Sequence, residues 1–250
     1  MEKIFSGKTA VVTGGRIGIG RGIAAKFASL GCGVAIYARG SEAGKKTAAE
    51  LTEQYGVPVT FYTCDVTDEA QVKATVAATV RDYGKIDFLV NNAGIYPAAP
   101  FLEMETEQFS RIFDINVKGL FLVTREVVQQ SMKAQRFGKI VSMSSVDSWL
   151  PTAGIIAYAA SKAAVNSLVK SFAIELQDYN ITSNGVAPGW VATEPVLKAG
   201  RWKTQIDSVL KKRMADVEEI ADIVAFLCED RADYMNGEVV NMSGGLLLNA

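Results

Sequence analysis

The chain reads Thr13-Gly14-Gly15-Arg16-Ile17-Gly18-Ile19-Gly20 at the point where its first apolar run ends and its first helical pattern begins. Glycines at this point allow the backbone to turn sharply and to come close to a bound group. The backbone N–H groups of such a turn, together with the positive end of the following helix, favour an anion such as a pyrophosphate. The stretch therefore predicts a strand, a phosphate-binding turn and a helix.

The rest of the chain continues this alternation of short apolar runs and longer helical patterns. Most of the apolar runs are continuous, as in strands that are buried on both faces of a parallel sheet. We expect strands at Thr9–Thr13, Gly33–Tyr37, Val57–Tyr62, Ile86–Asn91, Lys139–Met143, Ile181–Val186 and Glu238–Met242. We expect helices near Gly18–Leu30, Ala43–Tyr55, Asp68–Tyr83, Thr106–Gln135, Ala157–Asp178 and Val217–Cys228. This order predicts a doubly wound α/β fold of the Rossmann type, with a parallel seven-stranded sheet and helices on both faces.

Residues 1–250 are expected to form a single domain, because no linker, repeat or low-complexity segment interrupts them. The segment from 193 to 213 fits neither a strand nor a helix well, and it contains Pro195, Gly200 and Trp202. Long irregular insertions in compact domains are often lids over a binding site. We therefore expect a substrate lid near residues 193–213.

The composition argues against several classes of partner and chemistry. The 26 basic and 27 acidic residues give a net charge of −1, which leaves no surplus to hold nucleic acid or an anionic membrane. No apolar run approaches the roughly 18 residues of a membrane span and the first residues lack the order of a signal peptide, so we expect a cytoplasmic protein. The chain has no histidine, which removes Ser-His-Asp hydrolysis and His-containing zinc sites. Three cysteines without a short pairing predict buried thiols, and no metal site is expected.

The end of the second strand bears on the choice of a dinucleotide. A carboxylate at this place would bind the ribose 2′-hydroxyl of NAD, whereas an arginine accommodates the 2′-phosphate of NADP. The chain has Ala38 followed by Arg39 here. Arg39 therefore favours NADP, and a solvated loop charge is the alternative interpretation.

Tyr158 and Lys162 lie four residues apart near the start of an Ala-rich helix, so they share one helix face. Such a pair is common by chance, and its meaning depends on its surroundings. The preceding strand ends in Ser142-Met143-Ser144-Ser145, and a neighbouring strand ends in Asn91-Asn92-Ala93-Gly94. Because ligands bind beyond the carboxyl ends of the strands in such a sheet, these polar groups are expected beside the dinucleotide.

These motifs occur together in the order and at the spacings of a known family. The matching residues are Thr13 to Gly20, Asn91 to Gly94, Asn116, Ser145, Tyr158-x-x-x-Lys162 and Pro188-Gly189-Trp190-Val191-x-Thr193. Over essentially the whole chain, the sequence resembles the Tyr-x-x-x-Lys branch of the short-chain dehydrogenase/reductase family. The resemblance implies an NAD(P)(H)-dependent oxidoreductase, a carbonyl reductase or alcohol dehydrogenase, that interconverts a ketone or aldehyde and a secondary alcohol by hydride transfer.

The resemblance also implies a role for each matching side chain. Tyr158 would be the acid in carbonyl reduction and the base in alcohol oxidation, while Lys162 would stabilise its anion and hold the nicotinamide ribose. Ser145 would position the substrate oxygen, and Asn116 would hold a water in a proton relay. The residues expected to bind the cofactor are Gly14, Arg16, Ile17, Gly18, Gly20, Arg39, Asp65, Val66, Asn92, Ala93, Gly94, Tyr158, Lys162, Pro188, Gly189, Val191 and Thr193.

Two departures from the family's patterns leave alternatives open. NADP-dependent members often carry a basic residue where this chain has Ile17, and Arg16 lies one place earlier, so NADP(H) is favoured and NAD(H) is the alternative. Members that reduce 3-oxoacyl groups on acyl carrier protein often have a basic residue where this chain has Ile174. A carrier-bound substrate is therefore the second interpretation. A non-catalytic redox sensor that binds a dinucleotide is the alternative of another class.

Bulky side chains are expected around the crevice, at Tyr96, Trp149, Trp190 and Trp202. If they line the pocket, they favour a small ketone or alcohol with an apolar or aromatic body. The alternative is that about half of the bulky loop residues belong to the core or to subunit contacts. The family usually forms homotetramers through its long helices, so the resemblance also implies a homotetramer.

Overall fold

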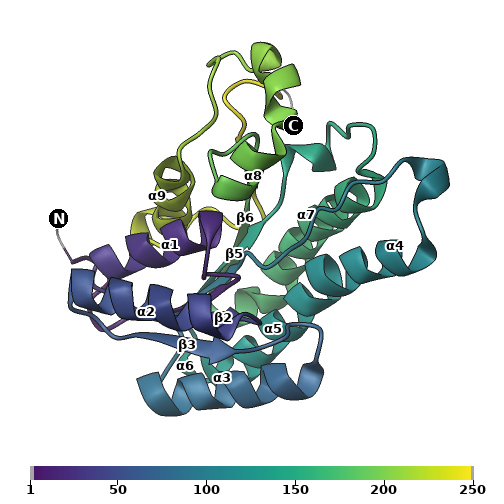
Figure 1. Cartoon of the computed structure of the whole chain (residues 1–250). Coiled ribbons are helices and arrows are strands. Elements are labelled where there is room, and N and C mark those ends of the chain that lie inside the picture. Colours follow the sequence, from purple (N-terminus) through teal and green to yellow (C-terminus); the bar gives the residue numbers. More distant parts are fainter. Residues whose placement is uncertain (1–2, 249–250) are drawn as a thin grey trace.

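The computed structural model describes residues 3–248, and seven strands of these residues form one sheet (Figure 1). The strands are β1 (Thr9–Thr13), β2 (Gly33–Ala38), β3 (Val59–Thr63), β4 (Phe88–Asn91), β5 (Gly138–Met143), β6 (Ile181–Pro188) and β7 (Val239–Met242). They are ordered β3-β2-β1-β4-β5-β6-β7, and every neighbouring pair is parallel. The predicted doubly wound fold class is confirmed. The strand order reverses between β1 and β4, which is where such sheets bind their ligands.

The continuous apolar character of the strands follows from burial on both faces. In β1, Val12 belongs to one core cluster and its neighbour Val11 belongs to the cluster on the opposite face. Successive side chains of a strand point to opposite faces, so a sheet covered on both sides needs apolar residues at every position.

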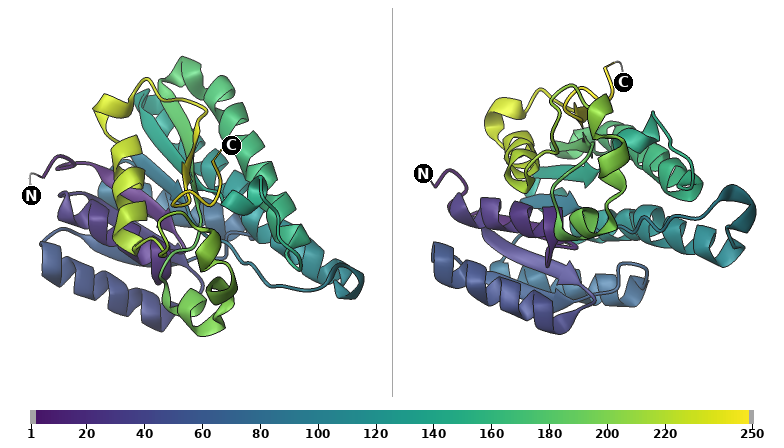
Figure 2. Two further views of the ribbon diagram at one scale, coloured as in Figure 1. Left: turned by 90° about the horizontal axis from the view of Figure 1, so that it is seen from above. Right: turned by 45° about the horizontal axis from the view of Figure 1, so that its top comes forward.

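Helices cover both faces of the sheet, as the views of Figures 1 and 2 show. The core on one face is shared by α1 (Gly18–Ser29), α2 (Ser41–Tyr55) and α9 (Val217–Leu227). The other face is covered by α3 (Glu69–Tyr83), α5 (Leu120–Val127) and α7 (Ile156–Leu176). α7 carries the Tyr158–Lys162 pair and packs along β6.

The helix predicted from Thr106 to Gln135 has those end residues, but it is not α-helical throughout. It consists of α4 (Thr106–Phe113), α5 and α6 (Lys133–Gln135), joined by π-helical segments over Asp114–Gly119 and Val128–Met132. A π-turn adds a residue to one turn and so rotates the side chains that follow it, and it often occurs at functional sites. The first π-segment contains Asn116, whose side chain is 1% exposed.

The segment predicted to be an irregular lid is largely helical, and this part of the expectation was wrong. It holds α8 (Glu194–Ala199) and two 3₁₀ turns, Arg201–Thr204 and Ile206–Ser208. Pro195 lies in the first turn of α8, where its missing N–H costs nothing, and Gly200 ends the helix at a φ of +69°. In Figure 1 this segment stands at the top of the molecule, above the carboxyl ends of the strands.

Other expectations from composition can be compared with the described residues. Cys32, Cys64 and Cys228 are buried and unpaired, which confirms the reading of them as buried thiols. Within residues 3–248, none of the helices combines the length and the apolar character that crossing a membrane requires.

Candidate active site

A cleft of about 840 Å³ lies beyond the carboxyl ends of the strands. Its walls are formed by the glycine turn after β1, the loops after β2 to β6, the start of α7 and the segment around α8. Every residue that was predicted to bind the cofactor lines this one cleft. Ser145 lines it as well, so the motifs that are distant in the sequence meet at the carboxyl edge of the sheet, where the strand order reverses between β1 and β4.

The glycine turn is held in a shape that only small residues allow. Gly14 and Gly18 have φ angles of +68° and +56°, a region that side chains with a Cβ rarely adopt. A Cβ on Gly20 would overlap the Asn92 side chain and the carbonyl oxygen of Gly14. The backbone of the turn is therefore exposed to the cleft, as contact with a pyrophosphate requires.

Thr13 ties the glycine turn to the loop after β4. Its Oγ1 accepts hydrogen bonds of 2.9 Å from the backbone nitrogens of both Asn92 and Ala93, and its carbonyl oxygen accepts one of 2.9 Å from Asn92 Nδ2. These bonds align two sides of the cleft. The N-cap residue of α1, Ile17, makes no side-chain cap and the first turn has no acidic residue. The orphan N–H groups of this helix start can therefore bind an anion.

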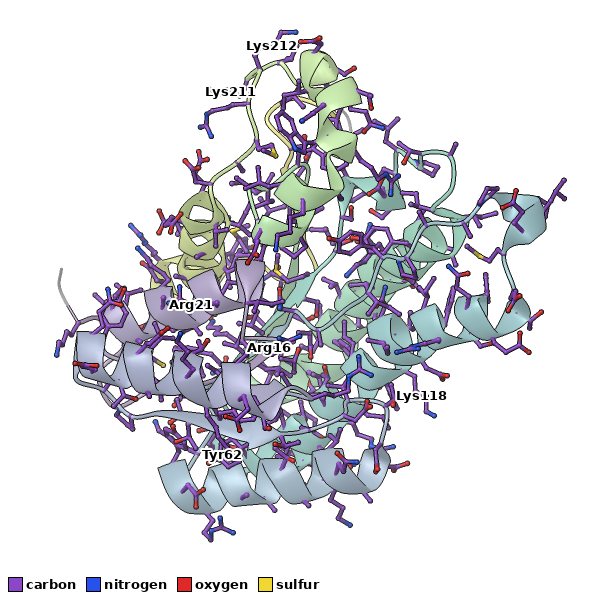
Figure 3. The ribbon with its side chains drawn as sticks, in the orientation of Figure 1. Arg16, Arg21, Tyr62, Lys118, Lys211 and Lys212 are labelled. Carbon is purple, nitrogen blue, oxygen red and sulfur yellow. The ribbon has the colours of Figure 1, made fainter. Side chains whose placement is uncertain are left out.

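Two guanidinium groups lie where the second strand ends. Arg39 Nη1 is 3.7 Å from Asp65 Oδ2, and a Cβ on Gly40 would lie 3.3 Å from Arg16 Nε. The carbonyl oxygen of Arg16 accepts a hydrogen bond from the Thr47 hydroxyl of α2. Figure 3 shows Arg16 between α1 and α2. Arg16 and Arg39 thus flank the start of α2, whose N-cap Gly40 offers no capping side chain.

Asp65 is held in its charged form in the wall of the cleft, beside Arg39. Burial raises the pKa of its carboxyl, but hydrogen bonds from the Thr67 backbone and hydroxyl, at 3.0 and 2.8 Å, and the charge of Arg39 together bring the pKa below its ordinary value. The same carboxylate therefore orients Arg39 and offers acceptor oxygens to the cleft.

Tyr158 and Lys162 face each other at the opposite end of the cleft. Lys162 Nζ lies 5.7 Å from the centre of the Tyr158 ring and donates a hydrogen bond of 2.7 Å to the carbonyl oxygen of Met143. Burial raises the pKa of the Tyr158 phenol, and the negative charge of Asp147 adds to this rise. Burial lowers the pKa of Lys162 to about 8. Both groups have been moved away from their ordinary titration ranges, as is common at functional sites.

Asn116 lies behind this pair rather than in the wall of the cleft. Its Oδ1 accepts a 2.9 Å hydrogen bond from the Ile95 nitrogen, and its Nδ2 donates bonds of 3.0 Å to Ile95 O and to Ser161 Oγ. A Cβ on Gly94 would lie 3.2 Å from Asn116 Oδ1 and 3.7 Å from Lys162 Nζ. Asn116 therefore joins the loop after β4 to α7 directly beside the lysine.

The four predicted substrate-pocket aromatics separate into two groups. Tyr96 and Trp190 line the cleft, and the Tyr96 ring lies 6.1 Å from that of Tyr158. Trp149 and Trp202 do not line it. Trp149 is partly buried and packs against the apolar cluster around Val165 and Val169 of α7. This contact removes part of its large apolar ring from water. The Trp202 indole nitrogen is buried with no partner among residues 3–248.

Comparison with known proteins places the chain in a family. Residues 14–247 match the family described as enoyl-(acyl carrier protein) reductase. The chain is 35% identical to the 3-oxoacyl-[acyl-carrier-protein] reductase of Aquifex aeolicus, over 98% of this chain and 100% of that protein. It is 37% identical to the enzyme of the same name from Thermotoga maritima, over 98% and 99%. A crystal structure of NAD⁺-bound xylitol dehydrogenase superposes with a TM-score of 0.92 at 34% identity, covering 96% of this chain and 99% of that one. The chain belongs to the short-chain dehydrogenase/reductase family.

As a short-chain dehydrogenase/reductase, the protein is an oxidoreductase of a family that binds a nicotinamide dinucleotide. The long cleft with its glycine turn fits that group, since the turn offers backbone to a pyrophosphate at one point and the Tyr158–Lys162 pair lies further along.

The sequence predictions did not include two charged residues that line this cleft, Asp147 and Arg201. Asp147 lines the cleft two residues after Ser145, and its Oδ2 accepts a hydrogen bond of 2.9 Å from Ser145 Oγ. The 3₁₀ turn over Val146–Ser148, with Ser145 at its N-cap, brings the two side chains together. A carboxylate so close in sequence to the predicted catalytic serine was the available signal.

Proposed function

We propose that the protein interconverts a ketone or aldehyde and a secondary alcohol, with NADP(H) as its preferred cofactor. The observation that carries this proposal is that Ser145, Tyr158 and Lys162 line the same cleft as the glycine turn. When bound, the nicotinamide would supply or accept the hydride.

The proton of the reaction is assigned to Tyr158. Burial keeps the phenol protonated in the free protein, so it can donate to the substrate oxygen during reduction. In oxidation the phenolate form is needed, and the nearby Lys162 ammonium favours it because opposite charges attract strongly in a buried site. Lys162 would also hold the nicotinamide ribose hydroxyls. Ser145 would orient the substrate oxygen toward Tyr158, and Asn116 would hold a water of the proton relay beside Lys162.

The preference for NADP(H) rests on the two arginines at the start of α2. Arg39 reaches Asp65, and Arg16 lies against Gly40, so a 2′-phosphate placed there would meet two guanidinium groups. Purified enzyme should therefore reduce a panel of ketones with NADPH at a kcat/KM at least tenfold above that with NADH. Reduction with NADH alone would overturn the cofactor assignment.

A second candidate is reduction of 3-oxoacyl groups on acyl carrier protein, favoured by the names of the two relatives above. Against it, Ile174 presents an apolar side chain that is 69% exposed at the place where the acidic carrier would meet a basic residue. Activity on acetoacetyl carrier protein that exceeds activity on simple ketones and falls steeply with salt would favour this candidate.

We also propose that the protein assembles as a homotetramer through its long helices. Phe109 of α4 and Phe121 of α5 are each 41% exposed on the helical segment from 106 to 135, and exposed aromatic side chains of this kind are often covered by a partner. Light scattering after size-exclusion chromatography tests this, and a mass of 26.8 kDa in solution would contradict it.

A further inference from the structure

Asp147 places a negative charge next to the side chain that positions the substrate. It is half-buried in the wall of the cleft, on the 3₁₀ turn that follows β5. Besides the bond from Ser145 Oγ, its own backbone nitrogen donates to that same hydroxyl at 3.2 Å. Two hydrogen bonds therefore join Asp147 and Ser145. A molecule that contacts Ser145 Oγ lies close to the Asp147 carboxylate, because the two oxygens are 2.9 Å apart.

The carboxylate has unused capacity to accept hydrogen bonds. An ionised carboxylate offers about four lone-pair sites on two oxygens. Among residues 3–248 only Ser145 donates to Asp147, through Oδ2, and none donates to Oδ1. Burial raises the pKa of this carboxyl, although the Ser145 hydroxyl and the charge of Arg201 oppose that rise. A half-buried acceptor of this kind is stabilised by a donor that arrives with a ligand.

The side chains around Asp147 do not supply that donor. Leu150, Pro151 and Ile155 form the apolar wall on its own side of the cleft. Arg201 of the segment 193–213 lines the cleft too, and its charge lowers the pKa of Asp147, but no ion pair joins the two groups among residues 3–248. The carboxylate thus shares this part of the cleft with apolar side chains of its own loop, while Arg201, Gln205 and Ser208 add polar groups to the wall.

We propose that Asp147 is a specificity-determining residue that accepts a hydrogen bond from a hydroxyl on the carbon next to the reacting carbonyl or carbinol carbon. The proposal rests on the function proposed above and narrows its substrate class to α-hydroxy ketones and vicinal diols, whose remaining body can be apolar.

The geometry favours this class because the Ser145 and Asp147 oxygens are 2.9 Å apart. Oxygens on adjacent carbons of a gauche vicinal diol are also separated by about one hydrogen-bond length. When the neighbouring substrate hydroxyl donates to Asp147, the single proton of Ser145 Oγ is free to turn from the carboxylate to the reacting oxygen. A simple ketone fills the same place but leaves the carboxylate without a donor, and a substrate carboxylate in this position would be repelled.

The test compares matched pairs of substrates that differ by one hydroxyl. Butanone is paired with 3-hydroxybutan-2-one, and 1-phenylpropan-1-one with 2-hydroxy-1-phenylpropan-1-one, so that the effect of the body cancels within each pair. In the wild type we expect kcat/KM to favour the hydroxylated member by about 10- to 100-fold, as for a hydrogen bond to a charged group. Asp147→Ala should abolish this ratio, and Asp147→Asn, which keeps one acceptor oxygen and the shape, should keep part of it.

Asp207→Asn is the matched control, because it removes a carboxylate of the segment 193–213 that does not line the cleft, and it should leave the ratio unchanged. Binding of butane-2,3-diol and butan-2-ol to the protein saturated with NADP⁺ is measured in parallel by calorimetry, which needs no turnover. Loss of the hydroxyl preference in Asp147→Ala, in either measurement, supports the proposal. Equal ratios in the wild type and Asp147→Ala would overturn it. Turnover of all four ketones without a hydroxyl preference would overturn it while leaving the proposed function intact.

Discussion

Lys162 Nζ lies 5.7 Å from the centre of the Tyr158 ring, and its hydrogen bond of 2.7 Å goes to the carbonyl oxygen of Met143 rather than to the phenol. In the proposed function the lysine acts on Tyr158 through its charge, at the end of β5 where Ser145 also lies. In a chain without histidine, we propose that this pair performs the proton transfer.

Replacing Tyr158 by Phe should remove the proton donor and leave the cleft otherwise unchanged. We expect kcat for ketone reduction to fall by about 10²- to 10⁴-fold, the usual contribution of a general acid. NADPH binding, followed by its fluorescence, should change less than threefold. Tyr234→Phe, at a fully exposed tyrosine, is the control and should keep wild-type activity. A Tyr158→Phe enzyme of normal activity would refute the role assigned to the phenol.

The rate of alcohol oxidation should rise with pH, because oxidation needs the phenolate of Tyr158. Since the Lys162 ammonium stabilises that anion, Lys162→Met should raise the pKa of Tyr158 and move the rise in kcat/KM to higher pH. The pH profile of kcat/KM between pH 6 and 10 checks this. An unchanged profile in the variant would show that the lysine does not tune the phenol.

Stability should also respond to Lys162, whose pKa is lowered by burial from 10.5 to about 8. Between these values the unfolded chain binds more protons than the folded one, so this group's contribution to the free energy of unfolding increases as pH rises from about 8 to 10. Urea unfolding at several pH values measures the slope. Lys162→Met should flatten it relative to the wild type, and equal slopes in the two proteins would contradict the burial assigned to this ammonium.

Arg39→Ala should weaken the enzyme's use of NADPH selectively. We expect KM for NADPH to rise about 10-fold or more, and KM for NADH to change less than twofold, because only the former carries a 2′-phosphate. Arg16→Ala should act in the same direction. Arg21→Ala is the control, since that side chain pairs with Glu50 on the surface (Figure 3). An equal rise of KM for NADPH and NADH would show that Arg39 stabilises the fold rather than binding the 2′-phosphate.

Gly20→Ala should disturb the turn, because the new Cβ would overlap the Gly14 carbonyl oxygen and the Asn92 side chain. We expect a loss of about 1–3 kcal/mol in the free energy of unfolding and at least tenfold weaker NADPH binding. Ser29→Ala at the other end of α1 serves as the control. Wild-type binding by Gly20→Ala would mean that the turn does not approach the cofactor as proposed.

Most of the fold was predictable from the sequence because burial on two faces leaves a direct mark on strands. The runs at Thr9–Thr13 and Lys139–Met143 are buried at every position, and for that reason their adjacent central residues are apolar rather than alternating with polar ones. The π-helical segment around Asn116 was not predictable, because one extra residue in a turn hardly changes the apolar period. α8 was missed because it is short and its Pro195 and Gly200 were read as loop residues.

The candidate site was predictable where backbone geometry or a motif requires a residue type, as at Gly14 and Gly20. It was less predictable where a bulky side chain can either pack in the core or line the cleft. Trp149 packs on α7 while Trp190 lines the cleft, and nothing in their local sequence separates the two. Asp147 was missed because its importance comes from a 3₁₀ turn that directs it to Ser145.

The transfer of deuterium from NADPH that carries deuterium at both C4 positions to the carbinol carbon of a ketone's product tests the central claim most directly. We predict that the wild type yields an alcohol labelled at that carbon. Tyr158→Phe should bind the cofactor but form the labelled alcohol at least 100-fold more slowly, as expected when a general acid is removed. Failure of the wild type to transfer the label to any ketone of the panel, or transfer by Tyr158→Phe at the wild-type rate, would contradict the account.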